Sequence, residues 1–213
     1  ALLIVVLTML FSAISFGCCI MYAVRFYKNL FTDEGYITWT LPASPLTQLW
    51  AKILSASIWY VLDLTICFAA AWFLISGDNI QSALERIKPD FQAALGMSFS
   101  SFCGLVVFFS FVGILSCVLF IYTSIAIGQL VPAHRIIVSI AVYFILNLIT
   151  QIISIGVSII TSVFPDYVFS PAQTSFSEYF FQMLLIGTCT TTVLAIAGYF
   201  ITYRILQRKV NLI

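Results

Sequence analysis

The sequence predicts an all-α protein, a bundle of helices that crosses a membrane several times. Of its 213 residues, 62% are hydrophobic and 8% are charged, whereas an ordinary globular chain is about 45–50% apolar and about 25% charged. Several apolar stretches are long enough to cross about 30 Å of hydrocarbon as helices, which takes about 20 residues. No segment shows the alternation over about ten residues that marks a barrel strand, and a helix satisfies its own backbone hydrogen bonds in lipid.

Five predicted spans form a single transmembrane domain over residues 1–213. Each is a nearly uninterrupted apolar run, and the gaps between them hold most of the charged residues, prolines and polar side chains. The approximate limits of the spans are 1–24, 53–75, 103–128, 136–163 and 179–203.

The basic residues predict the orientation of the spans. Seven of the nine Lys and Arg residues lie in the gaps 25–52 and 129–135 or in the C-terminal tail, and the positive-inside rule makes that side cytoplasmic. The chain is then a multi-pass protein of the cell (plasma) membrane with a cytoplasmic C-terminus. Five spans place residue 1 outside, so we expect one more span ahead of it, six in total. The seven residues are Arg25, Lys28, Lys52, Arg135, Arg204, Arg208 and Lys209.

The composition argues against several classes of function. Nine basic residues against eight acidic ones leave no cationic surface for a nucleic acid. None of the ten glycines precedes a lysine, so the phosphate-binding loop GxxxxGK[ST] is absent. The six cysteines lie in apolar runs without CxxC spacing, and we expect neither a disulfide framework nor a metal site. One histidine and a single mid-span aspartate do not supply the groups of an intramembrane protease, so we do not expect an enzyme.

The two gaps on the outer side are expected to hold more than plain loops. In the gap 76–102, Asn79 can cap a short helix that stops before Pro89. The gap 164–178 combines prolines with aromatic residues, which favours an interfacial or re-entrant element.

The cytoplasmic segment 25–49 is too polar to span the membrane and too aromatic for a solvated loop. Large apolar residues recur in it at helical spacing, with polar residues between them. This pattern predicts an amphipathic helix that lies in the membrane interface or is presented to a partner. The apolar residues are Phe26, Tyr27, Leu30 and Phe31.

Signals for helix ends follow in the same segment. Gly35 can end the amphipathic helix, because glycine adopts the left-handed conformation without penalty. Ser44 followed by Pro45 is typical of the start of the next helix, with serine as the N-cap and proline in the first turn.

This segment also resembles the first cytoplasmic loop of ABC-2-type transporter permeases of Gram-positive gut bacteria. The run Arg-Phe-Tyr-Lys-Asn-Leu-Phe-Thr-Asp-Glu-Gly-Tyr (25–36) is followed by Thr-Leu-Pro-Ala-Ser (40–44), where the family has a Phe-Thr-Leu-Pro-Val-Ser-like segment before its third span. The segments 125–130 and 203–212 fit the family as well, so the resemblance covers the chain after a missing first span. Trp39 and Ala43 replace the commoner Phe and Val, and neither change removes a group that docking needs.

The resemblance implies a permease subunit of an ABC exporter. In such permeases the loop between the second and third spans forms a coupling helix, which docks in a groove of a separate ABC ATPase subunit. ATP and Mg²⁺ are then expected on that subunit, with no cofactor on this chain, and a second permease copy or a relative completes the pathway through the lipid. The cargo of such exporters is often an antimicrobial peptide, a drug or a lipid-like molecule. The docking residues carried over are Phe26, Tyr27, Leu30, Phe31, Asp33, Glu34 and Tyr36.

The acidic pair has two interpretations. Asp33 and Glu34 can pair with basic groups on the ATPase, or they form part of a solvated turn.

Asp63 lies near the middle of the span 53–75, where an isolated carboxylate costs about 2.5–3.5 kcal/mol on the insertion scale. It is therefore expected to face the bundle interior, a wet cavity or a partner. It either lines a cargo path or makes an interhelical hydrogen bond. It is also the basis of an alternative function, an ion-coupled secondary transporter or channel.

Asn147 and Gln151 lie four residues apart and share one face of the span 136–163. Ser154 and Ser158 continue this face. A polar stripe inside lipid marks either a helix–helix seam or a cargo cavity. The threonines of the last span are instead expected to donate to their own helix backbone; they are Thr188, Thr190, Thr191 and Thr192.

Overall fold

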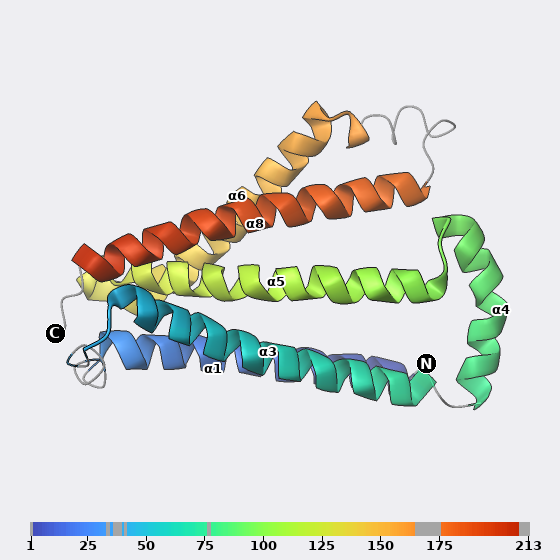
Figure 1. The fold of residues 1–213 in the computed structure, drawn as a ribbon, viewed down its shortest axis with the longest axis horizontal. Helices are drawn as coiled ribbons and strands as arrows, with labels where there is room; N and C mark the ends of the chain where they lie inside the picture. Colours follow the sequence, from blue (N-terminus) through green and yellow to red (C-terminus); the bar gives the residue numbers. More distant parts are fainter. Residues whose placement is uncertain are drawn as a thin grey trace.

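The computed structural model describes residues 2–32, 35, 40, 42–75, 78–164 and 176–208. Their fold is all-α, as predicted, and no strand occurs among these residues (Figure 1). The elements in chain order are α1 (Leu2–Phe31), α3 (Pro45–Ile75), α4 (Asp78–Leu95), α5 (Phe99–Gly128), the 3₁₀ turn η1 (Pro132–His134), α6 (Arg135–Ile160) and α8 (Phe176–Arg208).

Five of these helices, α1, α3, α5, α6 and α8, are long and apolar enough to cross a membrane. They correspond to the five predicted spans. The length and composition of these helices therefore support the predicted multi-pass membrane protein. The helices extend beyond the apolar runs: α3 begins at Pro45, whereas its apolar run begins near residue 53. An apolar run marks only the part of a helix inside hydrocarbon, while backbone hydrogen bonding continues through the polar residues that follow.

The predicted start of α3 is confirmed. Pro45 is its first residue, and the Ser44 hydroxyl accepts a hydrogen bond from the Thr47 N–H at 3.2 Å. Most of the second outer gap, residues 165–175, lies outside the described residues, and so does the interfacial element expected there.

Residues 25–31 are the last two turns of α1 rather than the start of a separate helix. The physical reason is burial: the aromatic face of these turns packs on other helices of the same chain. Residues 33, 34, 36–39 and 41 lie outside the described residues, so the interfacial coupling helix stays a prediction. Gly35 also differs from the prediction, since its φ is not positive. Glycine is needed there for a close approach, because a Cβ would lie 2.9 Å from the carbonyl carbon and oxygen of Leu30.

α4 confirms a helix in the first outer gap but is longer than predicted. It begins at Asp78, so Asn79 lies within its first turn, and it passes through Pro89 rather than stopping before it. Proline removes the hydrogen bond to the Glu85 carbonyl. Both residues are exposed, so water can replace that bond. The helix is followed by Gly96, whose φ of +66° is typical of a glycine after a helix C-terminus.

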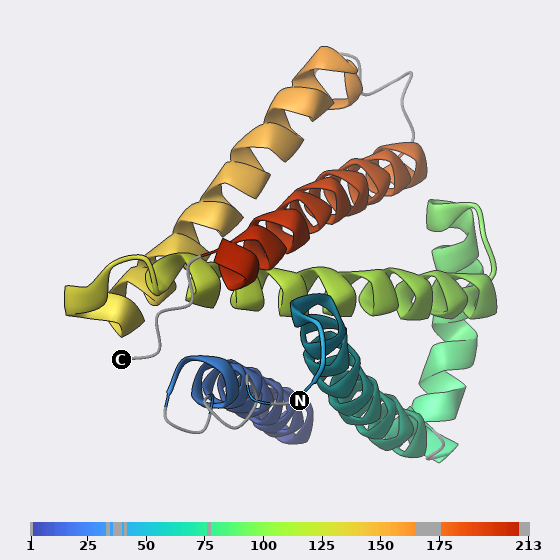
Figure 2. The same ribbon diagram turned by 60° about the vertical axis from the view of Figure 1, so that its left-hand side comes forward.

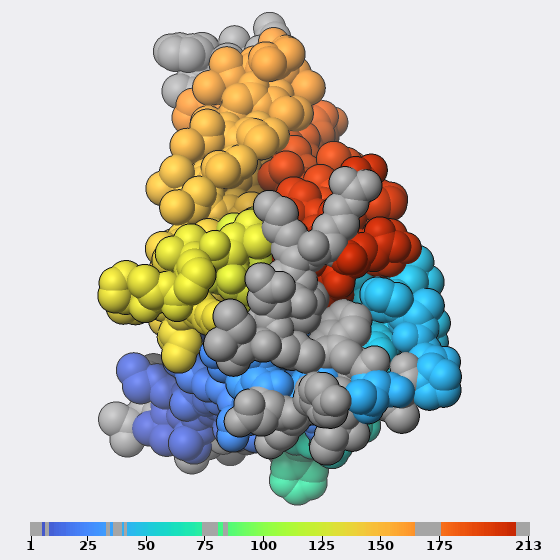
Figure 3. All heavy atoms as spheres, turned by 90° about the vertical axis from the view of Figure 1, so that its left-hand side faces the viewer, coloured from blue at the N-terminus to red at the C-terminus, as the bar shows by residue number. Residues whose placement is uncertain are grey.

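α5 is the central helix and contacts each of the other long helices. α6 and α8 pack on one side of it and α1 and α3 on the other, so the helices fan out around α5 in Figure 2. α4 lies across the ends of α3, α5 and α8 (Figure 1). We call the opposite end the basic end, because it carries Arg25, Lys52, Arg135 and Arg204; Figure 3 looks onto it.

The main hydrophobic core lies near the basic end rather than along the whole bundle. Away from it, large apolar side chains are exposed, as Phe73 near the end of α3 is at 83%. Such residues face lipid when the helices cross a membrane. The core residues, which we call the anchor cluster, are Tyr22, Phe26, Leu30, Phe31, Leu49, Ile53, Ala56, Val118, Ile121, Tyr122, Ile125 and Leu206.

Small residues let α5 and α8 approach closely beside this cluster. Ala126 and Ala195 are 0% and 1% exposed, and the hydroxyls of Thr123 and Thr202 lie 3.2 Å apart. A Cβ on Gly198 would come within 2.6 Å of Thr123 Oγ1. Close backbone packing of this kind takes the place of a hydrophobic driving force between helices in lipid.

The Gly198→Ala variant should destabilise the bundle by about 1–3 kcal/mol, because the added methyl group overlaps Thr123. The matched control is Gly187→Ala on the same helix, where a Cβ meets nothing within 4 Å and alanine gains about 1 kcal/mol in helix propensity. The midpoint of thermal unfolding in detergent checks the difference. Equal midpoints would contradict the close approach of α5 and α8.

Candidate functional site

The anchor cluster holds both ends of the segment that carries the family resemblance. Phe26 of α1 is stacked on Tyr122 of α5, with ring centroids 3.8 Å apart and ring planes 9° apart. The Tyr122 hydroxyl donates to the Lys52 carbonyl in α3 at 3.1 Å. α1, α3 and α5 are therefore joined about two turns before and after the segment 32–44.

Three of the predicted docking residues are buried within the described part of the chain. Phe26, Leu30 and Phe31 are 1%, 0% and 6% exposed, and Tyr27 packs against the same cluster. Burying such a side chain is worth about 1.5–3 kcal/mol, so exposing them to a partner would be costly. The other predicted docking residues lie outside the described residues: Asp33, Glu34 and Tyr36.

The last turns of α1 present cationic rather than aromatic groups to the surface. Arg25 and Lys28 are exposed, and they alternate with the buried aromatic residues around the helix.

Asp63 lies at the contact between α1 and α3. Its Oδ2 accepts a hydrogen bond from the Ser15 hydroxyl at 2.8 Å. About one turn nearer the basic end, the Tyr60 hydroxyl donates to Cys19 Sγ at 2.8 Å. Of the two possibilities for Asp63, a cargo path or an interhelical hydrogen bond, the structure shows the hydrogen bond.

Asn147 and Gln151 line a cavity of about 140 Å³ between α5, α6 and α8, which we call the polar pocket. It lies near the middle of α6, at membrane depth. Asp63 is on another helix–helix contact and takes no part in it, so the three residues predicted for a cargo path do not come together. The remaining lining residues are Gly113, Cys117, Phe120, Tyr143, Thr150 and Thr191.

The wall of the polar pocket combines polar and apolar groups and has no charged side chain. Asn147 donates from Nδ2 to the Tyr143 carbonyl at 2.8 Å, which leaves its side-chain oxygen as an acceptor. Thr150 and Thr191 donate to carbonyls four residues earlier in their own helices, at 2.8 and 2.6 Å, and their oxygens keep lone pairs. The pocket can therefore accept hydrogen bonds from water or from an uncharged polar group of a bound molecule.

The rest of the polar stripe on α6 forms a seam. Ser154 Oγ lies 2.6 Å from Thr190 Oγ1 of α8, while Ser158 is 1% exposed and donates to the Ile155 carbonyl at 2.8 Å. The stripe is thus cavity wall along one part and helix–helix contact along another. Donation to their own backbone is confirmed for the four threonines of α8: Thr188, Thr190, Thr191 and Thr192.

Several pocket residues were not predicted from the sequence. Tyr143 lies four residues before Asn147, so helical spacing alone places it on the same face. Cys117 and Thr191 come from α5 and α8. No pattern within one helix indicates which residues of its neighbours it faces.

Comparison with known proteins adds no relative: no family model, no curated protein and no solved structure matches this chain. The resemblance of residues 25–44 to ABC-2-type permeases therefore stays a prediction from the sequence.

Loss of the Ser15 hydroxyl should loosen α1 from α3. In Ser15→Ala the Asp63 carboxylate loses its donor, and hydrogen bonds to charged groups are worth about 1.5–3 kcal/mol. The matched control is Thr65→Val, because that hydroxyl is exposed and bonds only to the Val61 carbonyl of its own helix. Thermal unfolding in detergent should show a lower midpoint for Ser15→Ala alone. A drop of the same size in both variants would refute the interhelical role of Asp63.

Proposed function

We propose that this chain is the membrane-spanning permease subunit of an ATP-driven ABC-2-type exporter. It has five helices long and apolar enough to span a membrane, and its sequence lacks a nucleotide-binding loop. ATP hydrolysis then takes place in a separate subunit, which binds ATP and Mg²⁺ in the cytoplasm. A second copy of the chain, or a relative, supplies the other half of the pathway for an antimicrobial peptide, a drug or a lipid-like cargo.

The observation that carries this proposal is the anchoring of the loop 32–44. Before this segment, α1 is fixed by the stack of Phe26 on Tyr122. After it, α3 is fixed by Leu49 and Ile53, which are 1% and 3% exposed. A force on either end of this segment is therefore passed to three helices. A coupling element between an ATPase and a membrane pathway requires this property.

The distribution of packing indicates where the force would act. Buried side chains are concentrated in the anchor cluster, whereas the far ends of α1, α3 and α6 expose most of their large apolar residues. A packed core resists deformation, so the basic end acts as a pivot. Displacement of the loop would then change how far α1 and α3 are spread from α6 and α8 at the other end.

The alternative, an ion-coupled carrier or channel built on Asp63, receives less support. Its carboxylate is engaged by Ser15 and lies apart from the polar pocket.

Docking of an ATPase at the basic end is tested by reversing the acidic pair. In Asp33→Lys/Glu34→Lys, an ATPase with a GxxxxGK[ST] motif that copurifies with the native protein in mild detergent should be lost, as measured by mass spectrometry. Glu85→Lys/Asp90→Lys makes the same charge change at exposed positions of α4 and should retain the ATPase. Phe31 is unsuitable as a test site because it is buried.

Two results would overturn the docking assignment. The ATPase would be absent from the native preparation, or both double variants would retain it equally.

The pivot is tested by spectroscopic distance measurements across the far end. Labels on non-natural side chains at Phe73 and Phe176, which are 83% and 53% exposed, should change their separation when ATP and vanadate trap the native complex. Gly35→Val should keep the ATPase bound but abolish the change, because its side chain forces the loop away from Leu30. An unchanged separation in the native complex, or the same change in Gly35→Val, would contradict the pivot.

A further inference from the structure

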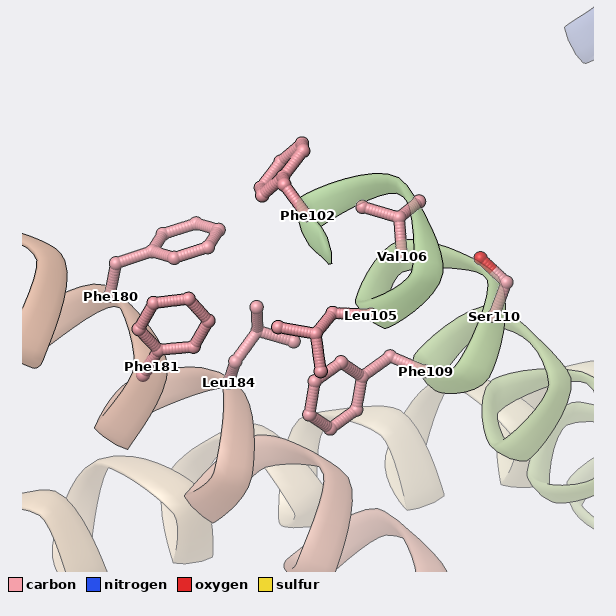
Figure 4. Close-up of a pocket in the computed structure, with 8 residues that line it drawn as sticks. All are labelled: Phe102, Leu105, Val106, Phe109, Ser110, Phe180, Phe181 and Leu184. Atoms are coloured by element: carbon pink, nitrogen blue, oxygen red, sulfur yellow. The ribbon is translucent and has the colours of Figure 1, made fainter. Parts of the chain in front are cut away.

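An apolar groove of about 320 Å³ lies between α5 and α8 at the end opposite the basic end. Figure 4 shows side chains of α5, among them Leu105 and Phe109, opposite Phe181 and Leu184 of α8. Ser110 is the one residue of the wall with a polar side chain. The remaining lining residues are Phe102, Val106 and Phe180.

The depth of the groove matches one leaflet of a bilayer. Its lining on α5 runs from Phe102 to Ser110, which at about 1.5 Å per residue is about 12 Å along the helix. Half of a hydrocarbon core of about 30 Å is about 15 Å. The groove also begins close to Phe99, where α5 starts, so it opens near the membrane surface and ends before the midplane.

α4 meets the groove at its surface end through a series of aromatic contacts. Phe91 of α4 lies edge-on to Phe99 and Phe102, with ring centroids 5.6 and 5.2 Å apart. Phe102 in turn contacts Phe180 of α8 at 6.4 Å. These contacts fix the second half of α4 beside the mouth of the groove.

α4 carries a cation about one turn from Phe91. Lys88 precedes Phe91 by three residues and so lies on the adjoining strip of the helix surface. Its side chain is exposed and makes no ion pair within the described residues. Arg86 is also exposed, but at about 100° per residue it lies on the opposite side of α4 from Phe91.

We propose that the groove and Lys88 together bind one anionic phospholipid, with an acyl chain in the groove and the phosphate against the Lys88 ammonium. An apolar wall at acyl-chain depth and a lysine at headgroup level match the two parts of such a molecule, and lysine side chains reach readily from an apolar surface to the headgroups. The site involves only α4, α5 and α8, so it stands independently of any ATPase.

The size of the groove favours an acyl chain over a helix from a second copy. A helix about 10 Å in diameter occupies about 850 Å³ over two turns, more than twice the groove volume of about 320 Å³. A single hydrocarbon chain is much thinner. The wall is lined mainly by aromatic and branched side chains, which pack well along such a chain.

The experiment uses a phosphatidylglycerol with a photoreactive diazirine in its acyl chain, added to the purified full chain in detergent. Crosslinks mapped by mass spectrometry should fall on groove residues such as Leu105 and Leu184. Val106→Trp fills the groove and should reduce these crosslinks at least tenfold. Val107→Trp is the matched control, because Val107 is 47% exposed and lies outside the groove; it should leave the crosslinks unchanged.

The headgroup is tested by the same labelling in competition. Lys88→Gln should weaken binding of phosphatidylglycerol about fivefold, whereas Arg86→Gln should not. A neutral diacylglycerol carrying the same photoreactive chain should bind the native protein about as weakly as phosphatidylglycerol binds Lys88→Gln. A free fatty acid that labels the groove as well as the phospholipid would overturn the assignment of a phospholipid.

Three further results would overturn the proposal. Crosslinks would be spread evenly over the exposed apolar residues, as for ordinary surrounding lipid; Val106→Trp and Val107→Trp would behave alike; or Val106→Trp would dissociate a dimer whose native form excludes the probe, which would identify a second copy as the occupant.

Discussion

The stack of Phe26 on Tyr122 is the contact on which the basic end depends. It extends α1 beyond the apolar part of its sequence, since the two extra turns gain burial against α5 instead of resting on a membrane surface. It also determines where the chain turns back: α1 ends at Phe31, Gly35 packs on the Leu30 backbone, and α3 begins at Pro45. The segment that resembles a coupling loop is thereby joined to the core of the bundle.

The positions of polar groups at membrane depth reflect the free-energy cost of leaving such a group unpaired in hydrocarbon. Asp63 pairs with the Ser15 hydroxyl of α1, and Ser154 pairs with the Thr190 hydroxyl of α8. Along Gln151 and Asn147, whose Nδ2 donates within its own helix, the helices leave a pocket with room for water. Structural and candidate binding positions therefore lie close together on α6, separated by only one turn.

The fold class and the spans could be predicted because hydrophobic length is written directly in the sequence. What packs against each apolar helix face could not be predicted. Phe26, Leu30 and Phe31 have the spacing of an amphipathic helix whether lipid, a partner or α5 lies against them. The passage of α4 through Pro89 was missed for a related reason, since the loss of a hydrogen bond is tolerated where water replaces it. The hydrogen bond of Asp63 could not be predicted either, because its partner lies on α1 and no pattern within α3 indicates which helix faces Asp63.

α5 connects all three features. Its basic end receives the anchor residues through Tyr122, its middle lines the polar pocket at Gly113 and Cys117, and its far half lines the apolar groove as far as Ser110. Ser110 and Gly113 are about 4.5 Å apart along the helix axis, so the groove ends where the pocket begins. A movement of α5 driven from the loop would therefore alter both binding surfaces together.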